Sequence, residues 1–264
     1  MDVITSAQNQ SVAEARKLKQ KKFREESGLY LAEGLRLAEE AAKAGSVLEV
    51  YYHESFSDME RGAELLSALS VKTRRFYQVT ARVLNTLAET ETPQGVVCVC
   101  ERRQASIKDF SPDRGLVVVA DGIQDPGNLG AILRTLWAAG SQGLICLPGT
   151  TDPYNGKCIR ASMGAIFNVP VFTDLRWSLV SRWALDHGYA AVAADAHGGT
   201  DYRQIEWPDK TLLCIGNEAK GLLTIPAEDI NERVFIPLAE EAESLNAAVA
   251  AGILIFGSKP IVRN

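Results

Sequence analysis

The sequence lacks the features that would set a chain of 264 residues apart from ordinary globular proteins. Its longest apolar stretch, residues 247–256, is much shorter than the roughly 20 residues that a membrane-spanning helix needs. The first residues, MDVITSAQNQSV, show no positive segment followed by an apolar block, so no secretory signal is expected. With 46% hydrophobic and 23% charged residues, the composition excludes a disordered or coiled-coil chain. We therefore expect a cytoplasmic protein of one or two domains that does not span a membrane.

Cysteine and histidine are also too sparse to suggest a metal site or a disulfide framework. The chain has five cysteines and three histidines, and no C-x-x-C pair occurs. The cysteines lie scattered inside apolar runs, which predicts buried reduced thiols and no metal.

Three common nucleotide and hydrolase motifs are missing. No G-x-G-x-x-G follows a predicted strand, no G-x-x-x-x-G-K-[ST] occurs, and there is no G-x-S-x-G. A Rossmann dinucleotide site, a P-loop and a nucleophile elbow are therefore unsupported.

Charge is distributed unevenly, although the whole chain carries only −5 and has a pI near 5.4. This balance argues against a protein that coats nucleic acid by bulk electrostatics. One segment nevertheless gathers positive residues, which we call the basic cluster: Arg16, Lys17, Lys19, Lys21, Lys22 and Arg24. The cluster predicts contact with an anionic partner at one place, the alternative being a solvated helix face.

The chain divides at the charged, turn-rich residues 101–114. Residues 1–105 predict a small mixed α/β domain that begins with one helix over residues 11–23. In residues 106–264, apolar strands alternate with helices, which predicts an α/β fold whose parallel sheet is covered on both faces. The strands are expected at residues 116–120, 143–147, 169–172, 190–193, 212–215 and 234–236, and the helices near 129–139, 156–166, 176–187 and 245–257.

Polar residues stand where three of these strands end, which is where open parallel sheets bind ligands. Asn128 and Arg134 follow the first strand, and Asn128 is a plausible N-cap of the next helix. Glu218 follows a buried strand, where a carboxylate is costly unless it is paired or used. Ser244 and Asn246 precede the last helix, with Ser244 the simpler N-cap candidate. Capped helices and plain turns remain an alternative explanation for each segment.

Taken in order, these segments resemble the SpoU (TrmH-like) family of RNA ribose 2′-O-methyltransferases. Asp125–Thr135 (DPGNLGAILRT) is similar to motif 1 of the family, Ile215–Leu222 (IGNEAKGL) to motif 2, and Ile236–Phe256 to motif 3. Residues 152–171 are similar to the family's segment between motifs 1 and 2. Residues 4–41 are similar to the L30e-like substrate-binding domain of the branch directed at rRNA.

The resemblance implies a SPOUT fold, which combines a parallel sheet with a deep C-terminal trefoil knot, a device that is rare in proteins. It implies a methyltransferase domain over residues 106–264 and a small L30e-like α/β domain that binds RNA over residues 1–105. It also implies S-adenosyl-L-methionine as methyl donor, no metal, and a homodimer whose active site forms at the subunit interface.

Carried over by motif, the resemblance implies five catalytic residues: Asn128, Arg134, Glu218, Ser244 and Asn246. It implies donor contacts from Gly216, Ile236 and Leu245, with Leu213, Ile215 and Leu238 nearby. Because arginine is normally always protonated, we favour Arg134 as a group that positions phosphate, and keep its role as direct base as an alternative. The basic cluster would then contact RNA phosphates.

The activity that this resemblance implies is donor-dependent 2′-O-methylation of a ribose in structured RNA, and the first domain favours 23S rRNA as the target. Three alternatives remain open: a tRNA 2′-O-methyltransferase, an inactive RNA-binding protein of the same fold, and a small-molecule α/β enzyme.

Overall fold

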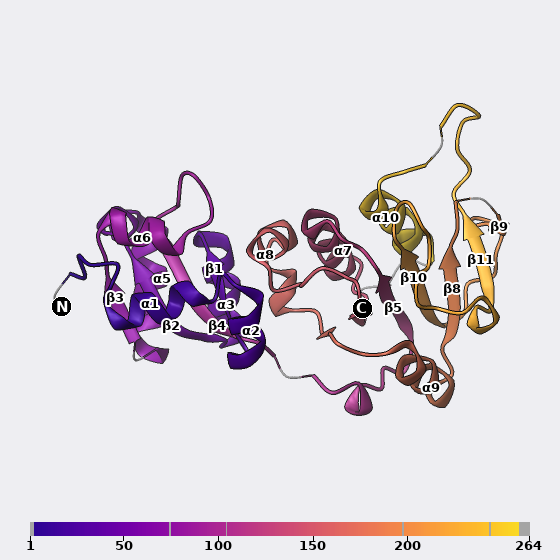
Figure 1. Ribbon diagram of the computed structural model, residues 1–264, viewed down its shortest axis with the longest axis horizontal. Helices are drawn as coiled ribbons and strands as arrows, with labels where there is room; N and C mark the ends of the chain where they lie inside the picture. Colours follow the sequence, from indigo (N-terminus) through magenta and orange to yellow (C-terminus); the bar gives the residue numbers. More distant parts are fainter. Residues whose placement is uncertain (1–2, 74, 104, 197, 243, 259–264) are drawn as a thin grey trace. The chain divides into compact units, whose positions relative to one another are not determined.

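The computed structural model describes residues 3–73, 75–103, 105–196, 198–242 and 244–258 (Figure 1). Contacts divide the chain into two compact units. The first unit holds residues 1–103 and 154–167, and the second holds 104–153 and 168–264. The sequence analysis places residues 154–167 in the second domain. In the structure they pack with the first unit.

The first unit is built on a four-stranded sheet in the order β1-β4-β2-β3. β4 is antiparallel to both of its neighbours, and β2 and β3 are parallel. The elements before residue 104 are α1 (Gln10–Lys17), α2 (Lys21–Ser27), β1 (Leu29–Glu33), α3 (Leu35–Ala44), β2 (Val47–Tyr52), α4 (Glu54–Ser57), α5 (Glu60–Lys72), β3 (Arg75–Gln78), α6 (Ala81–Leu87) and β4 (Val96–Glu101).

The single helix expected over residues 11–23 is wrong, because the structure has two helices there. The buried guanidinium of Arg24 donates hydrogen bonds to the carbonyl oxygens of Leu18 and Lys19 at 2.8 and 2.9 Å. These carbonyls follow the end of α1, so Arg24 stabilises the break between the two helices.

The segment 154–167 forms α8 (Gly156–Ser162) and η2 (Ala165–Phe167). The Tyr154 ring lies 5.0 Å from that of Tyr30, and the Arg102 guanidinium lies 4.3 Å from the Tyr154 ring centre. Gly164 has φ +99°, and a Cβ there would lie 2.6 Å from Cγ of Glu40. The segment is therefore an integral layer of the first unit.

The second unit confirms the parallel sheet that the alternation predicts. Its seven strands are all parallel, in the order β7-β6-β5-β10-β8-β11-β9. The sequence does not indicate the short strand β9, because its residues Thr200 and Asp201 form no apolar run. The elements are η1 (Ile107–Asp109), β5 (Gly115–Asp121), α7 (Pro126–Ala138), β6 (Gly143–Cys146), β7 (Val171–Phe172), α9 (Trp177–His187), β8 (Ala190–Ala194), β9 (Thr200–Asp201), β10 (Lys210–Gly216), η3 (Ala227–Asp229), β11 (Glu232–Phe235) and α10 (Ala247–Gly257).

Helices cover both faces of this sheet, as expected. α9 packs through Val180 and Trp183 on the face formed by Val117, Val119 and Leu212. Strand side chains alternate between faces, so Val118 and Leu213 point to the other face, where α7 contacts β6 and α10 contacts β10. No helix among the described residues is both long and apolar enough to cross a membrane.

Strand order decides where the polar segments meet. β5 and β10 are neighbours in the sheet, and Asp121 at the end of β5 pairs in register with Gly216 at the end of β10. The loops that follow these strands, more than 90 residues apart in the sequence, therefore begin side by side.

Candidate functional site

The first polar residue of the site stands in the first turn of α7. Asp125, not Asn128 as expected, is the N-cap of this helix, and its Oδ1 accepts a hydrogen bond from the Asn128 backbone N at 2.9 Å. Pro126 occupies the first helical position, where a missing N–H costs nothing. The side chain of Asn128 is thereby left to bond elsewhere.

The second polar residue stands in a tight turn after β10. Asn217 and Gly221 exchange backbone hydrogen bonds at 2.8 and 2.9 Å, which closes the turn around Glu218. Oδ1 of Asn217 also accepts from the backbone N of Ala219 and of Lys220, and its Nδ2 donates to the Gly122 carbonyl at 3.0 Å. Glu218 is therefore carried by a rigid turn and not by a loose loop.

The third polar residue begins the last helix. Asn246, not Ser244, is the N-cap of α10, and its Oδ1 accepts hydrogen bonds from the backbone N of Ala248 and Val249 at 2.9 and 3.3 Å. This fixes the side chain and aims its amide nitrogen away from the helix.

These three residues form one hydrogen-bonded chain. Nδ2 of Asn246 donates to Oδ1 of Asn128 at 2.9 Å, and Nδ2 of Asn128 donates to Oε1 of Glu218 at 2.8 Å. The amide of Asn128 accepts from one neighbour and donates to the other, so this series of hydrogen bonds ends at the carboxylate of Glu218. Residues from three separate segments thus orient a single negative group.

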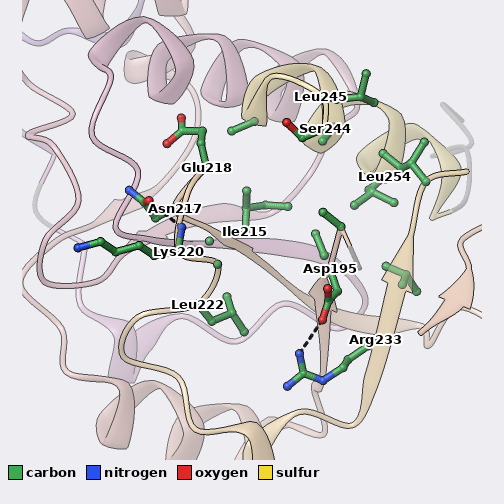
Figure 2. A pocket seen from close by; sticks show the side chains of 18 of the residues that line it. Asp195, Ile215, Asn217, Glu218, Lys220, Leu222, Arg233, Ser244, Leu245 and Leu254 are labelled. Atoms are coloured by element: carbon green, nitrogen blue, oxygen red, sulfur yellow. Dashed lines mark hydrogen bonds and ion pairs between the residues drawn. The ribbon is translucent and has the colours of Figure 1, made fainter. Parts of the chain in front are cut away.

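Glu218 lies on the wall of a cavity of about 520 Å³ at the ends of β8, β10 and β11. This volume is typical of sites for small-molecule ligands. The wall is part apolar and part polar. Its larger apolar side chains come from β10 and β11, from the segments that follow these strands, and from α10: Ile215, Leu222, Ile225, Val234, Ile236, Leu238, Leu245 and Leu254. Figure 2 shows Glu218 and Ser244 on this wall.

Sequence reasoning missed the charged pair at another part of the cavity wall. Nη1 of Arg233 lies 3.0 Å from Oδ2 of Asp195, and both residues line the cavity (Figure 2). Asp195 directly follows β8, so the strand-end rule that selected Glu218 could have found it. Lys220 also lines the cavity.

The donor contacts expected from the motifs fall mostly on this wall. Five of the six line the cavity: Ile215, Gly216, Ile236, Leu238 and Leu245. Leu213 does not, because it is fully buried in the middle of β10, where it packs in the core. Its expected place near a bound donor stays a prediction.

Arg134 and Ser244 stand outside the hydrogen-bonded chain. Arg134 is exposed on α7, and no described residue bonds to its side chain. Ser244 is exposed and lines the cavity without bonding to Asn128 or Glu218. The structure therefore brings three of the five expected catalytic residues into direct contact.

The basic cluster is less available to an anion than the sequence suggests. Arg24 is buried, so the expectation that it contacts RNA phosphates is corrected. Nζ of Lys19 donates to the Ala88 carbonyl at 2.6 Å, and burial lowers the pKa of Lys19. Three further lysines pair with glutamates on their own helices: Lys17 with Glu14, Lys21 with Glu25, and Lys22 with Glu26.

All five cysteines are buried as reduced thiols, as expected. Burial raises the pKa of the Cys98 thiol to about 12, so this thiol stays protonated at neutral pH. The described residues contain no cluster of histidine, cysteine, aspartate or glutamate that could hold a metal ion.

Comparison with known families gives two matches along the chain. Residues 115–256 match the SpoU rRNA Methylase family, and residues 9–98 match the MRM3-like substrate binding domain. The first match contains Asn128, Glu218 and Asn246 and every residue that lines the cavity.

Similar proteins extend over almost the entire chain. A 23S rRNA (guanosine(2553)-2′-O)-methyltransferase, RlmP of Bacillus subtilis, is 33% identical over 97% of this chain and 98% of its own. An AdoMet-bound rRNA methyltransferase from Sinorhizobium meliloti matches with TM-score 0.87 and 33% identity, covering 97% of each chain. AviRb, a SpoU methyltransferase from Streptomyces viridochromogenes in complex with AdoMet, matches with TM-score 0.84 and 28% identity, covering 95% of this chain and 97% of that one.

Proposed function

Because this chain belongs to the SpoU rRNA methylase family, we propose that it methylates the 2′-hydroxyl of a ribose in ribosomal RNA, with S-adenosylmethionine as donor. It is an RNA methyltransferase. The observation that carries the proposal is the chain of Asn246, Asn128 and Glu218, which delivers one oriented carboxylate to a ligand-sized cavity. The target is large-subunit 23S rRNA, as for the relative from B. subtilis.

The cavity fits the donor in size and in chemistry. Its apolar strand-end residues suit a flat adenine ring, and Asp195, Arg233 and Lys220 offer charged partners for a zwitterionic tail. When bound there, S-adenosylmethionine supplies a methyl group already activated by its positive sulfur. Ile215, Gly216, Ile236, Leu238 and Leu245 would hold it.

What remains for the protein is to position and deprotonate a poor nucleophile. Glu218 accepts a hydrogen bond from the ribose 2′-hydroxyl and would take up its proton as the oxygen is methylated, while Asn128 and Asn246 prevent the carboxylate from turning away. Ser244 offers a hydroxyl on the same wall. Arg134 binds the adjacent phosphate and stabilises negative charge that develops on the attacking oxygen.

The last helix supports two further parts of the proposal, a knot in the C-terminal half and a homodimer. α10 follows β11, which lies beyond β8 in the sheet, yet it packs against α7 and β10. This return path is what a trefoil knot in the C-terminal half requires.

We also propose that the first unit is the L30e-like domain that binds RNA, that residues 1–105 and 106–264 act as the two functional domains, and that the protein acts in the cytoplasm.

A second copy of the chain completes the site. α10 is apolar around its circumference, and its Val249 and Phe256 are 52% and 55% exposed. An exposed apolar face of this kind favours a homodimer. We expect Phe256→Glu to convert a dimer to a monomer in analytical ultracentrifugation, with Glu206→Lys as a surface control that stays dimeric; a wild-type monomer would contradict this arrangement.

The activity is tested directly with tritiated donor and 23S rRNA from cells that lack the enzyme. We expect label in RNA that resists alkaline hydrolysis at one position, since a 2′-O-methyl group blocks that cleavage. Transfer of label to a base, or to tRNA alone, would overturn the assignment.

A further inference from the structure

Asp121 is a fully buried carboxylate that the proposed chemistry does not use. It ends β5, and no ion pair to it is found among the described residues. Its Oδ2 accepts hydrogen bonds from the backbone N of Leu223 at 2.7 Å, of Thr224 at 2.8 Å and of Ile225 at 3.3 Å. Its Oδ1 accepts from the Thr224 hydroxyl at 2.8 Å. A buried carboxylate held only by neutral donors needs all of them.

The segment that Asp121 holds is part of the cavity wall. Leu222, which directly precedes the residues whose N–H groups bond to the carboxylate, and Ile225, the last of those residues, both line the cavity. The same strand end approaches this segment through Gly122, which has φ +80° and at which a Cβ would lie 2.3 Å from Cδ1 of Leu223. The position of the wall is therefore set by the end of β5.

Glu218 is held by a different set of bonds. The turn that carries it is fixed by Asn217, whose Nδ2 donates to Gly122, and Glu218 itself is fixed by Asn128. Loss of the bonds to Asp121 would consequently move the wall at Leu222 and Ile225 first, and leave the carboxylate of Glu218 in place.

We propose that Asp121 is a positioning residue for the methyl donor: its carboxylate clamps residues 223–225 and so shapes the donor-facing wall. Thr224 is the second half of this clamp, since its hydroxyl bonds to the remaining carboxylate oxygen. The inference rests on the proposed function, because it takes the cavity to be the donor site.

Thr224 gives the sharper test, since it is exposed and tolerates substitution better than Asp121. Thr224→Val removes the hydroxyl and keeps the shape, and Thr224→Ser keeps the hydroxyl. Thr211→Val is the matched control: Thr211 is buried at the opposite end of β10, where its hydroxyl donates to the Pro208 carbonyl at 2.8 Å.

The measurements are titration calorimetry with S-adenosylmethionine and steady-state kinetics on 23S rRNA. For Thr224→Val we expect the Kd and the KM for the donor to rise by about tenfold, because the wall segment loses one of its four hydrogen bonds to Asp121, with kcat at saturating donor unchanged. Thr224→Ser restores wild-type values, and Asp121→Asn shows a larger rise in Kd if it folds.

Two results would overturn the clamp: wild-type donor affinity in Thr224→Val, or an equal loss of affinity in Thr211→Val. A fall in kcat with an unchanged donor KM would also contradict it, because that would place the effect on Glu218. If the wild-type protein itself binds no donor, the proposed function fails, which is a separate outcome.

Discussion

The two units use their charged and polar residues in opposite ways. In the second unit, Asn128, Glu218 and Asn246 are far apart in the sequence, yet they bond directly to one another. In the first unit, the basic cluster is contiguous in the sequence, yet five of its six members bond to nearby glutamates and carbonyls. Proximity along the chain therefore did not predict which polar residues come together, whereas position at a strand end did.

The comparison is tested most strongly at the hydrogen-bonded chain. We expect Glu218→Gln and Asn128→Ala each to lower the rate of methyl transfer by about 10²- to 10³-fold, because the oriented carboxylate is lost. Donor affinity by calorimetry should change little. Glu206→Gln, an exposed carboxylate of the same unit, is the control. Near wild-type turnover in Glu218→Gln would contradict the assignment of these residues to the active site.

Arg134 sharpens the comparison, since it is a charge of the second unit that bonds to no described residue. We expect Arg134→Ala to lower the transfer rate by about 10²-fold, because a guanidinium that stabilises a developing charge is removed. Arg134→Lys should recover only part of the rate. Arg182→Ala on α9 is the control. A loss of donor affinity in calorimetry would contradict this role.

Arg24 tests whether charge in the first unit stabilises the fold. Arg24→Met removes the hydrogen bonds to the carbonyls of Leu18 and Lys19, which follow the end of α1, so the free energy of unfolding should fall by about 2 kcal/mol. Urea denaturation gives this value, and Arg16→Met, at an exposed position of α1, is the control. Equal stability of the two variants would show that Arg24 has no structural role.

The smallest effect is expected from the paired lysines. Replacing Lys17, Lys21 and Lys22 by Gln should weaken RNA binding a few-fold, because neighbouring glutamates already offset their charge. For every phosphate that the cluster no longer neutralises, the slope of log affinity against log salt concentration should become shallower by about 0.7–0.9. Filter binding at several salt concentrations measures this, with Lys72→Gln as control. An unchanged slope would exclude the cluster from the RNA interface.

The sequence could predict those parts of the fold and site that repeat a local pattern. Alternation of apolar strands and helices predicted the parallel sheet, and the strand-end rule selected Asn128, Glu218 and Asn246. The N-cap roles were assigned to the wrong residues, because Asp125 and Asn246 compete with neighbours of equal propensity.

Other features depend on packing that no local pattern encodes. Arg24 looks like one more surface cation until the turn of α1 places two carbonyls beside it. Asp121 looks like the end of a strand until residues 223–225, about a hundred positions later, fold over it. Asp195 could have been found with Glu218, but its partner Arg233 comes from a strand whose place in the sheet the sequence does not reveal.

The discontinuous first unit has a consequence for synthesis of the protein. As the chain leaves the ribosome from its N-terminus, the four strands of the first sheet are complete by Glu101. The layer containing Tyr154 and Phe167, whose rings lie 5.0 and 6.1 Å from that of Tyr30, has not yet been made. Part of the first unit therefore stays uncovered until β5 and β6 of the second unit have emerged. The first unit cannot complete its folding before synthesis of the second unit begins.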